Sequence, residues 1–100
     1  PRIGLLFAFS LSFMACKGDG QRLADILDLD GDVAAGGTFF SSNCSTCHGE
    51  DAGGGGAPNI QGREIDVVAE AALAGPGAMP SFSSSSDQEI ANVAAFVNSL

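Results

Sequence analysis

The C-terminal end of the chain carries its clearest hydrophobic pattern. Apolar side chains recur every three or four positions from Ile90 to Leu100, a spacing that makes one face of a helix apolar. Just before this run, Ser86 and Glu89 match the S-x-x-E capping box, in which each side chain bonds the backbone N–H of the other residue at a helix N-terminus. The pattern predicts a helix that begins after Ser86 and packs one face against the core.

Two earlier stretches also have the spacing of helices. Residues 33–43 follow Asp32, whose carboxylate suits an N-cap, and residues 66–74 stop at Gly75, a residue common just past a helix C-terminus. The first stretch contains two glycines, each of which costs about 1 kcal/mol relative to alanine. Such a cost suggests that another backbone passes close to Gly36. Since no segment alternates like a strand, the sequence predicts an all-α fold.

The beginning of the chain differs from the rest. Within residues 1–15 the only charge is Arg2, and the remainder is an apolar run interrupted by Gly and Ser. This run is too short for a membrane-spanning helix, which needs about 20 residues, and has the length of a signal-peptide core. We therefore expect a signal peptide over 1–15 and an exported, periplasmic protein. The alternative, a buried core helix, would lack caps and a polar face.

The residues around Cys16 suggest a membrane anchor. Phe13-Met14-Ala15-Cys16 resembles a bacterial lipobox, with Phe where Leu is usual. This favours a lipoprotein in which Cys16 carries an acyl anchor. The alternative is a cut after Ser12, which would give an exported protein without that anchor.

Residues 16–31 are expected to form a polar tether, with one helical turn around Leu23–Leu27, that leads to the folded domain at residues 32–100. Alternating aspartates from 28 to 32 resemble the start of a calcium loop. However, Val33 and Phe39 stand where such a loop has Gly and Glu, so a calcium site is disfavoured.

Composition limits what this chain can be. With 100 residues it holds one small domain, and 45% hydrophobic residues with seven Phe but no Trp or Tyr provide little material for a core. A chain of this size needs a disulfide, a metal or a cofactor to stabilise it. The net charge of −8 argues against nucleic-acid binding, which needs a basic face, and against electrostatic docking on anionic lipid.

Residues 44–48, Cys-Ser-Thr-Cys-His, form the C-x-x-C-H signature of haem c attachment. Two thiols three positions apart at the end of a helix can reach the two vinyl groups of one porphyrin and form thioethers. The adjacent histidine is then held under the iron. We expect haem c to be bound covalently through Cys44 and Cys47, with His48 as the proximal iron ligand.

Other uses of these cysteines fit the sequence less well. A zinc site takes four ligands, whereas the chain offers three cysteines and one histidine, with Cys16 at the far end. A thioredoxin-like pair needs a βαβ context, which the sequence lacks. A structural disulfide between Cys44 and Cys47 is the third alternative. Export favours haem, because haem c is attached outside the cytoplasm.

Met79 is the only methionine that follows the expected signal peptide. A thioether is a soft ligand, and a Met/His pair raises the potential of a haem. An isolated methionine usually fills a gap in the core. Met79 instead follows a loop of Gly, Pro and Ala and precedes Pro80, so we expect it to be the second axial ligand.

With these motifs, residues 31–100 resemble the class I c-type cytochromes, which are small monohaem electron carriers. Gly36 and Phe40 resemble the N-terminal helix of that family, and Phe96 resembles the aromatic residue of its C-terminal helix. The resemblance implies a cytochrome c fold, in which three to four short helices surround one covalent haem and these two helices cross.

Two loops extend the resemblance. The stretch from Ala57 to Gly62 resembles the family's G-P-x-L-x-G segment, and the stretch from Met79 to Phe82 resembles its axial-methionine loop. The resemblance implies that the Pro58 carbonyl orients the ring of His48 and that Ile60 lines the haem pocket. With no Trp or Tyr to bond a haem propionate, the residues that could do so are Arg63, Gln61 and Asn59.

The resemblance implies a single-electron carrier in a periplasmic chain and no enzyme activity, because two protein ligands leave the iron no open position. Loss of Arg2 with the signal peptide leaves twelve acidic and three basic residues, a net charge of −9. This charge should steer a monomer toward redox partners with basic docking patches. The alternatives are a haem-based sensor or ligand-binding module with a labile Met79, and a haem subunit of a larger oxidoreductase complex.

Overall fold

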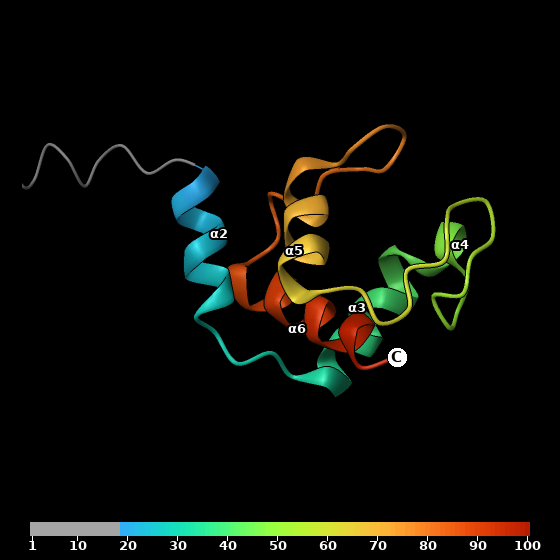
Figure 1. Cartoon of the computed structure of the whole chain (residues 1–100), viewed down its shortest axis with the longest axis horizontal. Coiled ribbons are helices and arrows are strands. Elements are labelled where there is room, and N and C mark those ends of the chain that lie inside the picture. Colours follow the sequence, from blue (N-terminus) through green and yellow to red (C-terminus); the bar gives the residue numbers. More distant parts are fainter. Residues whose placement is uncertain (1–18) are drawn as a thin grey trace, which may run out of the picture.

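A computed structural model describes residues 19–100, which form helices and loops without a strand (Figure 1). The predictions for the signal peptide and for Cys16 lie outside these described residues. The all-α prediction is confirmed, and four of the helices lie within residues 32–100, in agreement with the three to four expected. The helices are α2 (Asp19–Leu27), α3 (Val33–Asn43), α4 (Ser45–His48), α5 (Ile65–Ala74) and α6 (Asp87–Asn98).

The predicted helix ends are present. Asp32 caps α3, with Oδ1 accepting from the N–H groups of Ala34 (3.0 Å) and Ala35 (3.2 Å). At the start of α6, the Ser86 hydroxyl accepts from the Glu89 N–H at 3.1 Å, and the Glu89 carboxylate accepts from the Ser86 N–H at 2.9 Å. These caps satisfy N–H groups that have no partner inside the helix.

Helix α5 begins at Ile65, one residue before its predicted start, and ends as expected. Gly75 follows its last residue with φ of +63°, a left-handed conformation that glycine adopts without a steric cost. The Gly75 N–H donates to the carbonyl of Ala71 and completes the last turn. The glycine therefore turns the chain away from α5 and into the loop that carries Met79.

Helices α3 and α6 cross at Gly36, as predicted. Gly36 is buried, and a Cβ atom there would overlap the carbonyl oxygen of Asn92 in α6. The rings of Phe40 and Phe96 pack beside this crossing with centroids 5.4 Å apart. The backbone N–H of Asp32 also donates to the Asn92 side chain at 2.8 Å. The unfavourable glycine in α3 is thus explained by the close approach of the α6 backbone.

Helix α2 is longer than the single turn expected within the tether, and its contacts are those of a packed element. Ile26 is 1% exposed and belongs to a cluster of buried residues from α5 and α6, against which Leu23 also packs. These two residues are three positions apart and so share one face of the helix. The sequence around them is mostly polar, which hid this short apolar stripe.

Two clusters of buried residues form the core, and α6 contributes to both. One joins α2, α5 and α6, and the other joins Phe40, Ala52, Val93 and Val97. Helix α2 lies at one end of the molecule, and α4 with its following loop lies at the other (Figure 1).

None of the helices within residues 19–100 has the length and hydrophobicity needed to cross a membrane.

Replacing Gly36 with Ala should lower the free energy of unfolding by about 1–3 kcal/mol, because the new methyl group would push α3 and α6 apart. Chemical denaturation of the haem-loaded protein measures this change. Gly20→Ala in α2 is the matched control, since a Cβ there meets nothing within 4 Å. That variant should be equally or slightly more stable than the unchanged protein. Equal stabilities of the two variants would contradict the crossing.

Candidate haem site

The Cys-Ser-Thr-Cys-His motif lies in the turn that follows α3. The N–H of Cys44 still donates to the carbonyl of Phe40 at 2.8 Å, so Cys44 ends α3, and the short helix α4 begins directly after it. The N–H of His48 donates to the Cys44 carbonyl at 3.0 Å, which places these residues one helical turn apart. Cys44 is half-buried and Cys47 is exposed. The helical turn therefore brings both sulphur atoms and the imidazole to one region.

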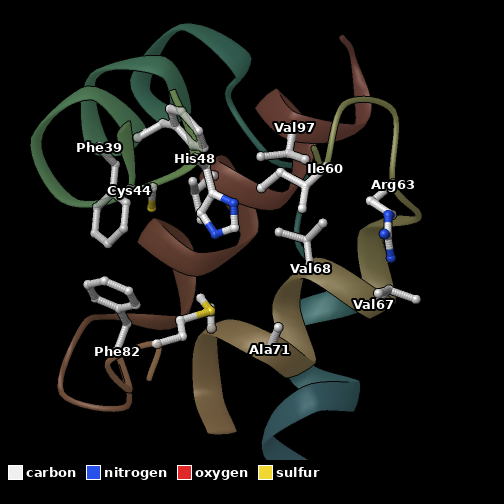
Figure 2. A pocket seen from close by; sticks show the side chains of 14 residues that line it. Phe39, Cys44, His48, Ile60, Arg63, Val67, Val68, Ala71, Phe82 and Val97 are labelled. Atoms are coloured by element: carbon white, nitrogen blue, oxygen red, sulfur yellow. The ribbon is translucent and has the colours of Figure 1, made fainter. Parts of the chain in front are cut away.

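The ring of His48 is held by the backbone of Pro58. Its Nδ1 lies 2.9 Å from the Pro58 carbonyl oxygen. Since a carbonyl oxygen only accepts, Nδ1 carries the hydrogen and Nε2 keeps its lone pair. Figure 2 shows the ring pointing into a cavity between Cys44 and Val68. The contact that the family resemblance implies is thus present, and it leaves Nε2 available as a ligand.

The glycine-rich loop after α4 brings Pro58 to this position. The N–H of Ala57 donates to the Cys47 carbonyl at 2.9 Å, and the N–H of Gly54 donates to the His48 carbonyl at 2.7 Å. A Cβ on Gly55 would lie 2.9 Å from the Cys47 carbonyl oxygen, so a side chain there would disturb the fit. The glycines therefore let this loop fold closely against the motif.

The cavity faced by His48 is apolar and lies among α3, α5, α6 and two loops. Its empty volume is about 630 Å³, including the mouth that opens to solvent. Its lining residues are Phe39, Phe40, Cys44, His48, Ile60, Arg63, Val67, Val68, Ala71, Ala72, Met79, Phe82, Val93 and Val97.

A second cavity adjoins the first, because the two have Cys44, His48, Met79 and Phe82 in common. It also reaches Cys47 and the loop at Gly56 and Ala57. Both cysteine sulphurs, the imidazole and the thioether thus converge on one continuous region. The site residues predicted from the sequence are brought together there, including Ile60 in the wall of the first cavity.

Met79 is carried to the cavity by a loop folded back on α5. The N–H of Phe82 donates to the Ala72 carbonyl, and the Ser81 hydroxyl donates to the Leu73 carbonyl, each at 2.7 Å. The Met79 N–H itself donates to the carbonyl of Pro76 at 3.1 Å. These bonds place the thioether among the residues of α3 and α5 that line the cavity.

Several lining residues were not singled out from the sequence. The rings of Phe39 and Phe82 pack edge-to-face at the cavity wall, with centroids 5.6 Å apart and an interplanar angle of 70° (Figure 2). Val68 and Ala71 of α5 line another wall. Phe82 ends the stretch that resembles the axial-methionine loop, whereas no motif marks the other three, and their helical periodicity predicts only that they face the interior.

The three residues considered for a haem propionate differ in whether their side chains already have hydrogen-bond partners in the structure. The Gln61 side-chain amide donates to the Asp51 carbonyl at 2.8 Å, and the Asn59 side chain accepts from the Gln61 N–H at 2.9 Å. Both therefore serve the loop itself. Arg63 lines the cavity, and its guanidinium forms no hydrogen bond or ion pair within residues 19–100. Arg63 is the available cation at the cavity.

Burial affects the thiol of Cys44. Loss of solvent, with a smaller contribution from the nearby Cys47, raises the pKa of the Cys44 thiol to about 11. The thiol therefore keeps its proton at neutral pH.

Within the described part of the chain, no group of three or more His, Cys, Asp and Glu side chains could hold a metal ion.

The residues present fit a haem c. The cavity offers apolar walls for a flat macrocycle, two thiols for its vinyl groups, a nitrogen and a sulphur donor for iron, and one cation. A thioether bond forms when a thiol adds across a vinyl group: the sulphur binds one vinyl carbon and the hydrogen passes to the other. This addition needs no external oxidant.

Comparison with known proteins also points to c-type cytochromes. The protein family described as cytochrome C oxidase, cbb3-type, subunit III matches residues 31–97. Cytochrome c6 of Leptolyngbya boryana is 35% identical over 79 residues, which cover 66% of this chain and 89% of that protein. No solved structure matches the chain. Because the family match extends over more than half of the residues, the chain belongs to this family of c-type cytochromes and binds haem c covalently through Cys44 and Cys47.

Proposed function

We propose that this protein transfers single electrons, with His48 and Met79 as the axial ligands of its haem. The observation that carries the proposal is that an imidazole with a free Nε2 and a thioether line one apolar cavity next to both cysteines. When bound, the haem supplies an iron that alternates between two oxidation states one electron apart. The family and the cytochrome c6 relative support the role of electron carrier.

The protein's own residues set the conditions for that chemistry. The Pro58 carbonyl keeps the hydrogen on Nδ1 of His48 and fixes the direction of the ring, as hydrogen-bond partners of metal-ligating histidines do. Met79 supplies a soft donor, which favours the reduced state and raises the potential. Because both axial positions are then filled by side chains, a substrate has no position on the iron. This is why an electron carrier fits better than an enzyme.

The walls of the cavity are apolar. Val68, Ala71 and Phe82 present apolar groups to the cavity. Apolar walls do not reorient when a charge changes, so little rearrangement accompanies transfer of one electron. Arg63 is the side chain we assign to a haem propionate, because it is the cation at the cavity and is not engaged elsewhere in residues 19–100.

The cellular setting belongs to the same proposal. The apolar run at residues 1–15 and the haem c motif both point to export, since haem c is attached outside the cytoplasm. We propose a periplasmic monomer that is held at a membrane by an acyl group on Cys16. Its partners would be redox proteins with basic docking patches, because the chain has twelve acidic and four basic residues.

A second candidate is a permanent haem subunit of a larger oxidoreductase. The family description, which names subunit III of an oxidase, favours it. A subunit of this kind would co-purify with its complex in stoichiometric amount, whereas a mobile carrier would be released when membranes are solubilised.

Met79→Ala should open the iron to external ligands. The reduced wild-type protein should not bind carbon monoxide, whereas the reduced variant should bind it promptly, as measured by optical spectroscopy. The potential of the variant should fall by on the order of 100 mV, a fraction of the roughly 0.8 V range that axial ligands span. Ser84→Ala, an exposed residue of the same loop, is the control. Prompt binding by the wild type would favour the sensor with a labile Met79.

The chain should be largely unfolded without haem, because the apolar walls of the cavity would face water. Far-ultraviolet circular dichroism of the Cys44→Ser/Cys47→Ser variant prepared without haem should show much less helix than the haem-loaded protein. The wild-type chain expressed without the attachment machinery is the matched control. A haem-free chain with the full helix content and a cooperative thermal transition would contradict this expectation.

Electron transfer should respond to salt according to the charge of the reagent. Oxidation of the reduced protein by a cationic small-molecule oxidant should slow several-fold as salt rises, since the Debye length falls from about 30 Å at 0.01 M to about 8 Å at 0.15 M. Oxidation by an anionic oxidant should become faster. Stopped-flow absorbance measures both rates. The same salt trend for the two oxidants would argue against steering by the negative charge.

A further inference from the structure

Arg22 of α2 binds the segment that follows Met79. Its Nη1 and Nη2 donate to the carbonyl oxygens of Ser83 (2.6 Å) and Ser85 (2.7 Å), and its Nε donates to Oδ1 of Asp87 at 2.8 Å. The ion pair is partly exposed and contributes little by itself. The planar guanidinium nevertheless fixes the directions of all three acceptors at once, which an ammonium group cannot do.

The same segment is bound to α5 on its other side. The Phe82 N–H donates to the Ala72 carbonyl and the Ser81 hydroxyl donates to the Leu73 carbonyl. The residues between Met79 and α6 are therefore held from two directions. The α5 contacts hold the part next to Met79, and Arg22 holds the part next to α6.

A short turn connects the two sets of contacts. The Ser85 N–H donates to the Phe82 carbonyl at 2.9 Å, so a residue held by Arg22 is bonded directly to one that lines both cavities. The Phe82 ring packs edge-on against Phe39 and lines the same cavities as Met79 (Figure 2). Release of this turn would loosen Phe82 and, three residues earlier, Met79.

We propose that Arg22 is a positioning residue for Met79, which keeps the methionine loop closed against the haem cavity. This inference rests on the proposed ligation by His48 and Met79. Helix α2 precedes residues 31–97, the part of the chain that the family matches. The proposal therefore assigns to α2 a role at the haem site, although α2 contributes no residue to the cavity wall.

The test is the affinity of the oxidised, haem-loaded protein for imidazole, which competes with Met79 for the iron. Arg22→Gln keeps the side chain as far as Cδ but loses the charge and the fork of donors. It should bind imidazole about tenfold more tightly than the wild type, as expected for the loss of hydrogen bonds from a charged group. Arg22→Lys should lie between the two. Gln21→Ala, on the same turn of α2 but bonded to Asp25 of its own helix, should not differ from the wild type.

Two further measurements separate positioning from general stability. Ile26→Val should destabilise the α2 contact without touching the loop carbonyls, and it should leave imidazole affinity unchanged even where it lowers stability as much as Arg22→Gln does. Amide hydrogen exchange in Arg22→Gln should be faster at Ser85 and unaltered at Gly36, in the α3–α6 crossing. Equal acceleration at both amides, or a rise in affinity that follows stability in all variants, would overturn the proposal.

Met79→Ala in the same assay separates this inference from the function on which it rests. If Met79→Ala binds imidazole more tightly than the wild type and Arg22→Gln does not, Met79 is a ligand and the role of Arg22 is wrong. If Met79→Ala and the wild type bind imidazole equally, the ligation by Met79 is wrong, and the role of Arg22 is wrong with it.

Discussion

A chain with so few large side chains cannot fill its own interior, and the rest of the structure depends on this shortage. Half of the ten buried hydrophobic residues among those described are alanines. The two core clusters meet around an apolar cavity, and α5 and α6 both contribute to its walls. A flat hydrophobic cofactor would supply the missing volume, so we expect binding of the cofactor and folding of the chain to be coupled.

The two proposed iron ligands are held by backbone contacts more than by side-chain packing. His48 is oriented by a carbonyl from a loop that contains several glycines, and the Met79 loop is bonded to the carbonyls at the end of α5. Loops can place donors at angles that helices cannot, but they need anchors. Helices α3 and α6, locked together at Gly36, supply the rigid frame for them.

The sequence predicts well the features that are encoded locally. The caps at Asp32 and Ser86 and the glycine after α5 set the helix ends within one residue. The haem motif and the contact between Pro58 and His48 also followed from short stretches and their resemblance to a family. These features need only a few neighbouring residues to be identified.

The sequence missed features that depend on distant residues and that the family resemblance does not include. Helix α2 is stabilised by Ile26 in a core formed by α5 and α6 and by Arg22 on carbonyls more than sixty residues away. Polar residues around them suggested a tether. Phe39 and Val68 meet at one cavity only because α3 and α5 are brought together by α6. The residues next to Phe39 and Val68 in the sequence do not indicate that these two side chains line one cavity.

The charges of the protein affect electron transfer between identical molecules. In residues 19–100 the only basic side chains are Arg22, which is paired with Asp87, and Arg63, at the haem cavity. One positive group is thus paired, the other is exposed at the cavity, and the whole chain carries a charge of −8. Collisions between identical molecules are therefore repulsive, and electron self-exchange within a pool of this cytochrome should be slow. Each electron would then leave the molecule chiefly through an oppositely charged acceptor.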